Sequence, residues 1–329
     1  MERIFITGAD GLLGSNTVRE LLSRKYKLKA LIQKGSKSKT LEGLDIEFVE
    51  GDLLDKESLI KHVKGCDAII HIAALTNVWP IRHEIYYKVN VEGTKNMIEA
   101  ALSNNIQRFI HISSASAFGF GPKNQPGNES TVTMAKAFGL DYVDSKLDAQ
   151  DVILDAVKER NLPAVVVNPT FMIGPYDSKP SSGAVILAVA NRELKLVTSG
   201  GKNWVYVKDV AVGISNALTK GRIGEMYILG NENLSYKEAT SLIAEVAGVA
   251  PPSIKVHSFL VKIAGRLGSL IGTISGKAPK ISFPVAKISL IDQYYDPSKA
   301  RKELELPVTP IKKAVEDSMQ WFKENGYAK

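Results

Sequence analysis

Cysteine is almost absent from this chain, since Cys66 is the single cysteine among 329 residues. One thiol excludes an intramolecular disulfide, and a long chain without disulfides is typical of a reducing compartment. The first residues, Met1-Glu2-Arg3, lead into a short apolar stretch that lacks the features of a secretory signal. We therefore expect a cytoplasmic protein whose stability comes from its hydrophobic core.

Long apolar runs are also missing. The most apolar stretch, Ser258–Ile274, contains Lys262, Arg266 and three glycines, which argues against a membrane-spanning helix. We expect a buried amphipathic helix here, with a helix at a membrane interface as the alternative. No stable membrane insertion is predicted.

A concentrated basic patch is missing as well, although the net charge is +7. The basic residues are scattered, and their densest cluster is Lys34, Lys37 and Lys39. Nucleic-acid-binding proteins usually gather such residues on one face. We expect a small-molecule substrate, no nucleic acid and no metal site.

Regular alternation of apolar and helical segments is present in the first half of the chain. Apolar runs of four or five residues predict strands at Ile4–Thr7, Leu28–Ile32, Ile46–Val49, Ala68–His71, Phe109–Ser113 and Ala164–Asn168. Helices are predicted between them at Leu12–Lys25, Lys56–Lys64, Tyr86–Asn104 and Asp144–Arg160. Apolar strands separated by helices indicate a parallel sheet that is covered on both faces. The predicted fold class is α/β, a Rossmann-type doubly wound parallel sheet with a smaller, mostly helical lobe.

A glycine-rich loop follows the first predicted strand. Its glycines are Gly8, Gly11 and Gly14, each three residues apart. Gly8 permits the tight turn, Gly11 allows a pyrophosphate to approach the backbone, and Gly14 allows close packing of helix on strand. The following helix then points its N-terminus at the phosphates. Between a strand and a helix, this spacing predicts a dinucleotide-binding loop.

The end of the second predicted strand lacks the acidic residue that would bind a free ribose 2′-hydroxyl. The sequence there is Gln33-Lys34-Gly35-Ser36-Lys37. Lysines and hydroxyls suit a 2′-phosphate better, so we expect NADP in preference to NAD.

Two tyrosine–lysine pairs have the spacing of neighbours on a helix face, namely Tyr142 with Lys146 and Tyr295 with Lys299. A cation beside a phenol lowers the phenol's pKa and makes it a usable proton donor or acceptor. Pro297 lies inside the second pair and disfavours helical geometry at the residue before it. The first pair is therefore the predicted proton-transfer centre.

These motifs resemble the extended short-chain dehydrogenase/reductase family, part of the NAD-dependent epimerase/dehydratase superfamily, over essentially the whole chain. Thr7–Gly14, His71–Ala74 and Asn90–Asn96 match family segments. The resemblance implies that Asp52 faces the adenine and that Asn90 is architectural. With the glycine loop, it implies cofactor contacts from Gly8, Asp10, Gly11, Leu12, Leu13, Gln33, Lys34, Lys37, Asp52, Leu53, Ala73, Ala74, Tyr142, Lys146, Pro169, Thr170, Phe171 and Met172.

The resemblance also implies catalytic roles for Ser114, Tyr142 and Lys146, with Ser113 and Ser116 as alternatives to Ser114. Tyr142 would transfer a proton to or from the substrate oxygen, and Ser114 would orient that oxygen. Lys146 would lower the tyrosine's pKa and bind the nicotinamide ribose.

The pattern is closest to dihydroflavonol 4-reductase-like and 3β-hydroxysteroid dehydrogenase-like members. Asn168-Pro169 resembles these reductases, whereas sugar dehydratases would carry Asp-Glu where this chain has Ala115 and Ser116. The segment Lys202–Val210 also lacks the arginine that often binds a sugar nucleotide's diphosphate. We expect reduction of an aldehyde or ketone, with a nucleotide-sugar epimerase and a non-catalytic NADP-binding sensor as alternatives.

Large apolar residues follow three of the predicted strands, at the edge where doubly wound folds bind ligands. Trp79, Phe118 and Phe171 are the predicted substrate contacts and indicate a fairly apolar substrate. We expect the nucleotide domain to comprise 1–170 plus about 204–232, and the substrate-binding lobe about 171–203 plus 233–329. By analogy with relatives, helices Tyr86–Asn104 and Asp144–Arg160 are the predicted face of a homodimer.

Overall fold

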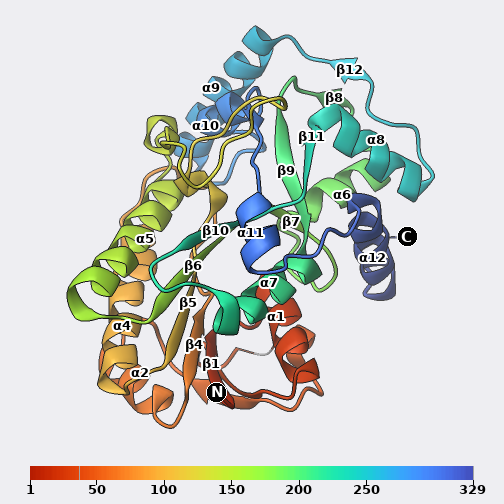
Figure 1. Ribbon diagram of the computed structural model, residues 1–329. Coiled ribbons are helices and arrows are strands. Elements are labelled where there is room, and N and C mark those ends of the chain that lie inside the picture. Colours follow the sequence, from red (N-terminus) through yellow and green to blue (C-terminus); the bar gives the residue numbers. More distant parts are fainter. Residues whose placement is uncertain (37, 329) are drawn as a thin grey trace.

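A seven-stranded parallel sheet forms the centre of the molecule (Figure 1). The computed structural model describes residues 1–36 and 38–328. The strand order is β10-β6-β5-β4-β1-β2-β3. The strands are β1 (Arg3–Thr7), β2 (Lys27–Ile32), β3 (Glu47–Glu50), β4 (Ala68–His71), β5 (Arg108–Ile112), β6 (Ala164–Pro169) and β10 (Met226–Leu229). The six predicted strands each match within one residue, and the doubly wound α/β fold is confirmed.

Helices cover both faces of this sheet, as the alternation of side chains along the strands requires. Ile4 and Ile6 of β1 pack in the cluster that includes α1 and α7, whereas Phe5 packs in the cluster of α2, α4 and α5. Figure 1 shows the two helix layers on opposite sides. Their bounds are α1 (Leu12–Ser23), α2 (Lys56–Val63), α4 (Gly93–Ser103), α5 (Asp141–Arg160) and α7 (Val207–Lys220).

The helix predicted over Tyr86–Asn104 is interrupted. It comprises α3 (Ile85–Tyr87), a π-helical turn (Lys88–Glu92) and α4. A π-turn shifts the following residues around the helix axis and is frequent near functional sites. Here it contains Asn90, whose side chain is buried.

A second, smaller assembly lies beside the carboxyl edge of β6 and β10. Strand β9 (Gly201–Tyr206) pairs with β7 (Phe171–Ile173), β11 (Glu232–Ser235) and β13 (Asp292–Gln293). Strands β8 (Leu196–Val197) and β12 (Ile254–Lys255) form a separate pair. The accompanying helices are α6 (Ala184–Ala190), α8 (Tyr236–Ala247), α9 (Ser258–Ser275), α10 (Phe283–Ile288), α11 (Ser298–Glu303) and α12 (Ile311–Glu324).

The expectation of a buried helix at Ser258–Ile274 is wrong. The segment is helical as α9, but of its side chains only Val261 is a buried large apolar one. Ile271 is 63% exposed and Ile274 is 78% exposed. Within the described residues, no helix has both the length and the apolar character that a bilayer span requires.

Candidate active site

The glycine loop is tightly packed on one side and open on the other. Gly8 has a φ of +68°, and a Cβ there would lie 2.7 Å from the Ala73 nitrogen. A Cβ on Gly14 would lie 2.0 Å from the Gly8 oxygen. At Gly11 the nearest described atom, also the Gly8 oxygen, would be 3.7 Å away. Gly8 and Gly14 are therefore needed for packing, and Gly11 leaves room for a ligand.

The N-terminus of α1 suits a pyrophosphate. Gly11 is the N-cap and gives no side-chain cap to the first amides, those of Leu12 and Leu13. No acidic residue lies in the first helical turn. Uncapped amides and the helix dipole favour an anion at this position. Asp10, which precedes them, is half-buried, and its carbonyl accepts a hydrogen bond from Thr40. The loop therefore fits the phosphates of a dinucleotide.

The region predicted for the adenosine end is exposed. Gln33 and Lys34 follow β2 and are exposed, while Lys37 lies outside the described residues. Asp52 is also exposed, and its Oδ1 accepts a hydrogen bond from the Leu54 amide at 2.9 Å. Leu53 is buried.

Sequence reasoning missed an acidic residue in this region. Glu50 ends β3, and its Oε1 accepts a hydrogen bond from the Gly35 amide at 3.3 Å. Glu50 is paired with Ile32 across the parallel strands. The carboxylate therefore comes from the neighbouring strand β3. The sequence expectation considered only the residues that directly follow β2, so it could not include Glu50.

A buried polar network lies beneath the glycine loop. Thr7 Oγ1 is 2.8 Å from His71 Nδ1, and His71 Nε2 is 3.1 Å from Thr94 Oγ1. The Ala73 amide donates to Thr7 Oγ1 at 3.2 Å. Burial and the nearby Lys146 lower the pKa of His71 to about 3. A neutral His71 thus connects β1 to α4, and Thr7 holds the loop after β4, where Ala73 and Ala74 lie half-buried.

The predicted catalytic residues are assembled by β5 and α5. Ser114 follows β5 and is half-buried, and its Oγ accepts a hydrogen bond from Ser116 Oγ at 2.8 Å. Helix α5 begins at Asp141, so Tyr142 and Lys146 lie on it one turn apart. Lys146 Nζ donates to the carbonyl of Ile112, the last residue of β5, at 2.5 Å. This contact fixes the lysine at the strand end from which Ser114 projects.

Contacts from distant segments hold the first two turns of α5. Asp141 accepts hydrogen bonds from Arg82 and from the His83 amide, the latter at 2.8 Å. Asn90 Nδ2 donates to Ser145 Oγ at 2.9 Å, and Asn90 Oδ1 accepts from the Leu75 amide at 2.7 Å. Asn90 therefore connects the loop after β4 to α5, and such a contact is consistent with the architectural role expected for it.

The electrostatics differ from the expectation that Lys146 lowers the pKa of Tyr142. Burial raises the pKa of the Tyr142 phenol. Burial also lowers the pKa of Lys146 to about 8. Desolvation is the cause of both shifts, and Tyr142 is a protonated phenol at neutral pH.

The segment after β6 brings polar and aromatic groups to the same edge. Thr170 Oγ1 donates to Asn203 Oδ1 at 2.8 Å. Phe171 packs edge-on against Trp204, with ring centroids 4.6 Å apart. Lys202 Nζ lies 4.6 Å from the Phe171 ring centroid, and burial lowers the pKa of this lysine to about 8. Pro169 is buried, whereas Thr170, Phe171 and Met172 are half-buried beside the site.

The other two predicted substrate contacts have different environments. Trp79 is half-buried and packs against α9, where a Cβ on Gly272 would lie 2.7 Å from its ring. Phe118 is only 4% exposed and packs in a small core cluster with Ile228 and Tyr295. The packing of Phe118 favours a structural role over contact with a substrate.

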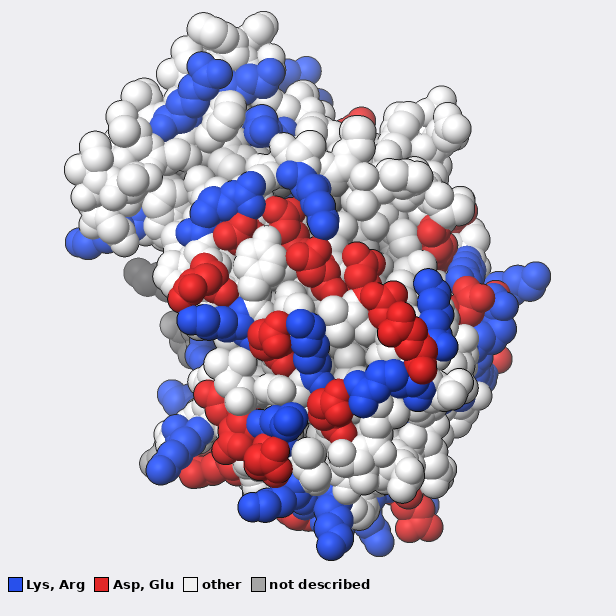
Figure 2. All heavy atoms as spheres, turned by 90° about the vertical axis from the view of Figure 1, so that its left-hand side faces the viewer, with Lys and Arg blue, Asp and Glu red and all other residues white. Residues whose placement is uncertain are grey.

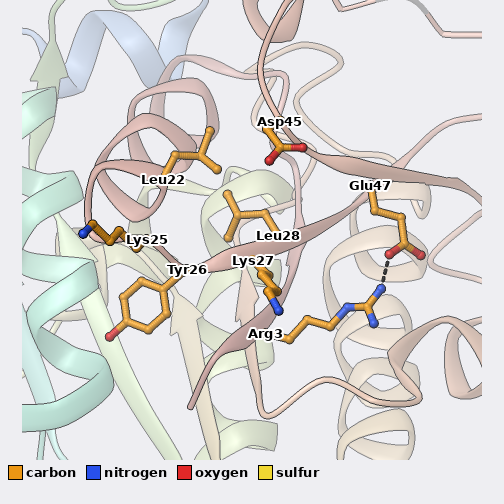
Figure 3. A pocket seen from close by; sticks show the side chains of 8 residues that line it. All are labelled: Arg3, Leu22, Lys25, Tyr26, Lys27, Leu28, Asp45 and Glu47. Carbon is orange, nitrogen blue, oxygen red and sulfur yellow. Dashed lines mark hydrogen bonds and ion pairs between the residues drawn. The ribbon is translucent and has the colours of Figure 1, made fainter.

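A separate hollow lies at the opposite edge of the sheet (Figure 3). Arg3, Lys27 and Glu47, the first residues of β1, β2 and β3, contribute to it. Arg3 and Glu47 form an ion pair across it. Doubly wound folds bind ligands at the carboxyl edge of the strands, so this hollow is not the candidate site. No cluster of three potential metal ligands occurs among the described residues.

Comparison with known proteins agrees with this geometry. The chain is 33% identical over 330 residues to a Synechocystis sp. protein named "Putative dihydroflavonol 4-reductase", covering 99% of this chain and 96% of that one. It is 30% identical over 325 residues to sterol demethylase protein B of Methylococcus capsulatus, covering 98% of each chain. The crystal structure of gox2253 superimposes with a TM-score of 0.88 at 33% identity, covering 100% of both chains. The model of the NAD dependent epimerase/dehydratase family matches residues 4–230. The chain belongs to this NAD-dependent epimerase/dehydratase family.

Proposed function

We propose that the chain is an NADP(H)-dependent oxidoreductase that interconverts a carbonyl and an alcohol on a fairly apolar small molecule. The observation that carries this proposal is the joint position of Ser114 and of Tyr142 and Lys146. Lys146 is held at the end of β5 by the Ile112 carbonyl, and Tyr142 lies one helical turn before it. Proton transfer at a carbonyl oxygen needs an acid and an orienting hydroxyl in such proximity.

Each residue then has a defined role. A bound nicotinamide cofactor would supply or accept the hydride. Tyr142, protonated because burial raises the pKa of its phenol, donates the proton to the substrate oxygen during reduction. Ser114 donates a hydrogen bond to the same oxygen and orients it. The positive charge of Lys146 stabilises the phenolate that Tyr142 becomes after donation.

The cofactor preference follows from the charges at the adenosine end. Lys34 is exposed there and would attract a 2′-phosphate, whereas Glu50 beside Gly35 would repel it. We propose that the cation prevails and that NADP(H) is bound in preference to NAD(H). The pyrophosphate would bind the amides of Leu12 and Leu13 at the start of α1.

We propose that the chain has a cofactor-binding part and a substrate-binding part. Residues 1–170 plus about 204–232 would bind the cofactor, and about 171–203 plus 233–329 would bind the substrate. Phe171 and Trp79 are the proposed apolar contacts, since each is half-buried at this edge. We also propose a homodimer through α4 and α5, which light scattering would test, and a cytoplasmic location, with which the single buried Cys66 agrees.

A nucleotide-sugar epimerase is the second candidate, because the matching family model includes epimerases. Purified protein would be mixed with NADPH and a panel of aldehydes and ketones while absorbance of the reduced cofactor is followed. Net oxidation of NADPH with an apolar carbonyl supports the proposal. Interconversion of a UDP-sugar without net cofactor turnover would assign the chain to the epimerases. A non-catalytic sensor would bind NADPH and remain inactive in both assays.

A further inference from the structure

A surface helix usually turns its large apolar side chains toward the protein. In α9 the inward face instead carries mostly glycines. Val261, Gly265, Gly268 and Gly272 recur at helical spacing on this face. A Cβ on Gly265 would lie 2.5 Å from the Ala286 Cβ, and one on Gly268 would lie 2.1 Å from the Ile281 oxygen. The neighbouring segments approach so closely that only glycine fits. The inward packing therefore leaves the large side chains of α9 outside.

The outward face is a continuous apolar stripe. Its residues are one, three or four positions apart in an order that places them all on one side of the helix. They are Phe259, Leu260, Ile263, Leu267, Leu270, Ile271 and Ile274, and all of them are exposed. Contiguous exposed apolar side chains of this kind mark an interaction surface rather than ordinary solvent-facing residues.

The sequence segment that contains this stripe carries charge of one sign only. Between Glu245 and Asp292 the sequence contains no acidic residue and six basic ones, Lys255, Lys262, Arg266, Lys277, Lys280 and Lys287. Since the whole chain has a net charge of +7, these six leave a net charge of only +1 for the remainder. In Figure 2 the upper left lobe, at the height of α9 and α10 in Figure 1, presents blue and white spheres without red ones.

Lys262 and Arg266 lie on one flank of the stripe, since Lys262 is three positions after Phe259 and Arg266 is three positions after Ile263. Both are exposed. Long basic side chains beside an apolar stripe can remain in the lipid headgroup layer while the stripe enters the acyl boundary. Anionic headgroups would neutralise the local excess of positive charge.

We propose that the apolar stripe of α9, with Lys262 and Arg266 on its flank, docks on an anionic lipid surface, with the helix lying in the plane of the interface. Self-association through this face is disfavoured, because a two-fold contact would bring Lys262 and Arg266 of both copies close together. The proposal concerns peripheral binding and does not depend on the reaction catalysed.

Vesicle flotation of the full chain tests the proposal. Vesicles of phosphatidylcholine with about one third phosphatidylglycerol should bind the protein, and phosphatidylcholine alone should bind it at least about tenfold more weakly. The double variant Leu270→Glu/Ile271→Glu should lose at least about tenfold in binding to the anionic vesicles, since both apolar contacts become charged. Lys262→Gln/Arg266→Gln should weaken it about fivefold, and salt should weaken it further.

Matched variants separate the stripe from general changes of charge. Ile223→Glu/Val308→Glu adds the same charges at positions of similar exposure, and should bind vesicles like the wild type. Circular dichroism and the melting temperature would establish that all variants are folded. Failure of the wild type to bind anionic vesicles would overturn the proposal, as would undiminished binding by the Leu270/Ile271 variant. A change from dimer to monomer in that variant, with no vesicle binding by the wild type, would instead assign the stripe to self-association.

Discussion

The two tyrosine–lysine pairs have the same spacing and opposite environments. Tyr142 is half-buried within α5, and the ammonium of Lys146 contacts the Ile112 carbonyl. Tyr295 is 5% exposed and packs in a core cluster before Pro297. Lys299 Nζ lies 2.7 Å from a carboxylate oxygen of Glu225 and 2.7 Å from the Met226 carbonyl. A lysine neutralised by a carboxylate cannot stabilise a phenolate as well as one without such a partner.

Spacing is therefore a weak signal until the backbone between the two residues is known. Helix α11 begins at Ser298, after Tyr295, so the second pair does not share a helix face. The first pair lies within one helix, α5, and its first residue, Asp141, accepts a hydrogen bond from Arg82. This difference supports the proposed role of the first pair in proton transfer, whereas the second pair packs within the fold.

The largest expected effect separates the two tyrosines. Tyr142→Phe should lower kcat/KM for carbonyl reduction about 1,000-fold, because the general acid is lost. Tyr295→Phe should leave kcat/KM within about twofold, because its ring packing is retained. Steady-state NADPH oxidation measures both, and fluorescence titration should give unchanged NADPH affinity within about threefold. Equal losses in the two variants would contradict the assignment.

Replacement of Lys146 should lower the catalytic rate, whereas replacement of Lys299 should lower the stability. Lys146→Met should lower kcat/KM about 100-fold, because the cation beside the phenol is removed. Lys299→Met should leave the rate nearly unchanged but lower the free energy of unfolding by about 1 kcal/mol, since the hydrogen bonds from its ammonium to the Glu225 carboxylate and the Met226 carbonyl are lost. Chemical denaturation and initial rates on the same preparations would measure the two effects. A purely structural loss at Lys146 would show as lowered stability with normal kcat.

The prediction of the fold from sequence succeeded where local patterns decide the structure. The six strands were predicted within one residue, because each is a short apolar run between helices. The start of α5 was predicted at Asp144 rather than Asp141, because the contacts from Arg82 and His83 come from a segment about 60 residues away.

The errors have a common physical origin in tertiary contacts. The periodicity of α9 predicts an apolar stripe but not which side faces the protein, and Ala286 and Ile281 approach the glycine side. The prediction that Lys146 lowers the tyrosine's pKa omitted desolvation. Glu50 was missed because the pairing of β2 with β3 brings it to the loop after β2.

The two lysines should also differ in their effect on the pH dependence of the rate. Burial lowers the pKa of Lys146 to about 8, so its positive charge is present below that pH and is lost as the pH rises through it. Tyr142 stays protonated over the same range because its pKa is raised. The kcat/KM for reduction should be level below about pH 8 and fall by up to about tenfold per pH unit above it. Lys146→Met should lack this step, whereas Lys299→Met should keep it.

The smallest effect concerns the cofactor. Glu50→Gln should raise the ratio of kcat/KM for NADPH to that for NADH about threefold, because a negative charge beside the proposed 2′-phosphate position is removed. Glu47→Gln, at the other end of the same strand, is the matched control and should leave the ratio unchanged. An unchanged ratio in the Glu50 variant would place the 2′-position elsewhere.

The most direct test of Tyr142 as the proton donor replaces a single tyrosine with 3,5-difluorotyrosine, whose phenol loses its proton at lower pH. In the Lys146→Met variant, whose profile lacks the lysine's step, this residue at position 142 should move the alkaline limb that remains to lower pH. At position 295 it should leave the profile of that variant unchanged. A shift caused by position 295, or no shift from position 142, would contradict the assignment of proton transfer to the Tyr142–Lys146 pair.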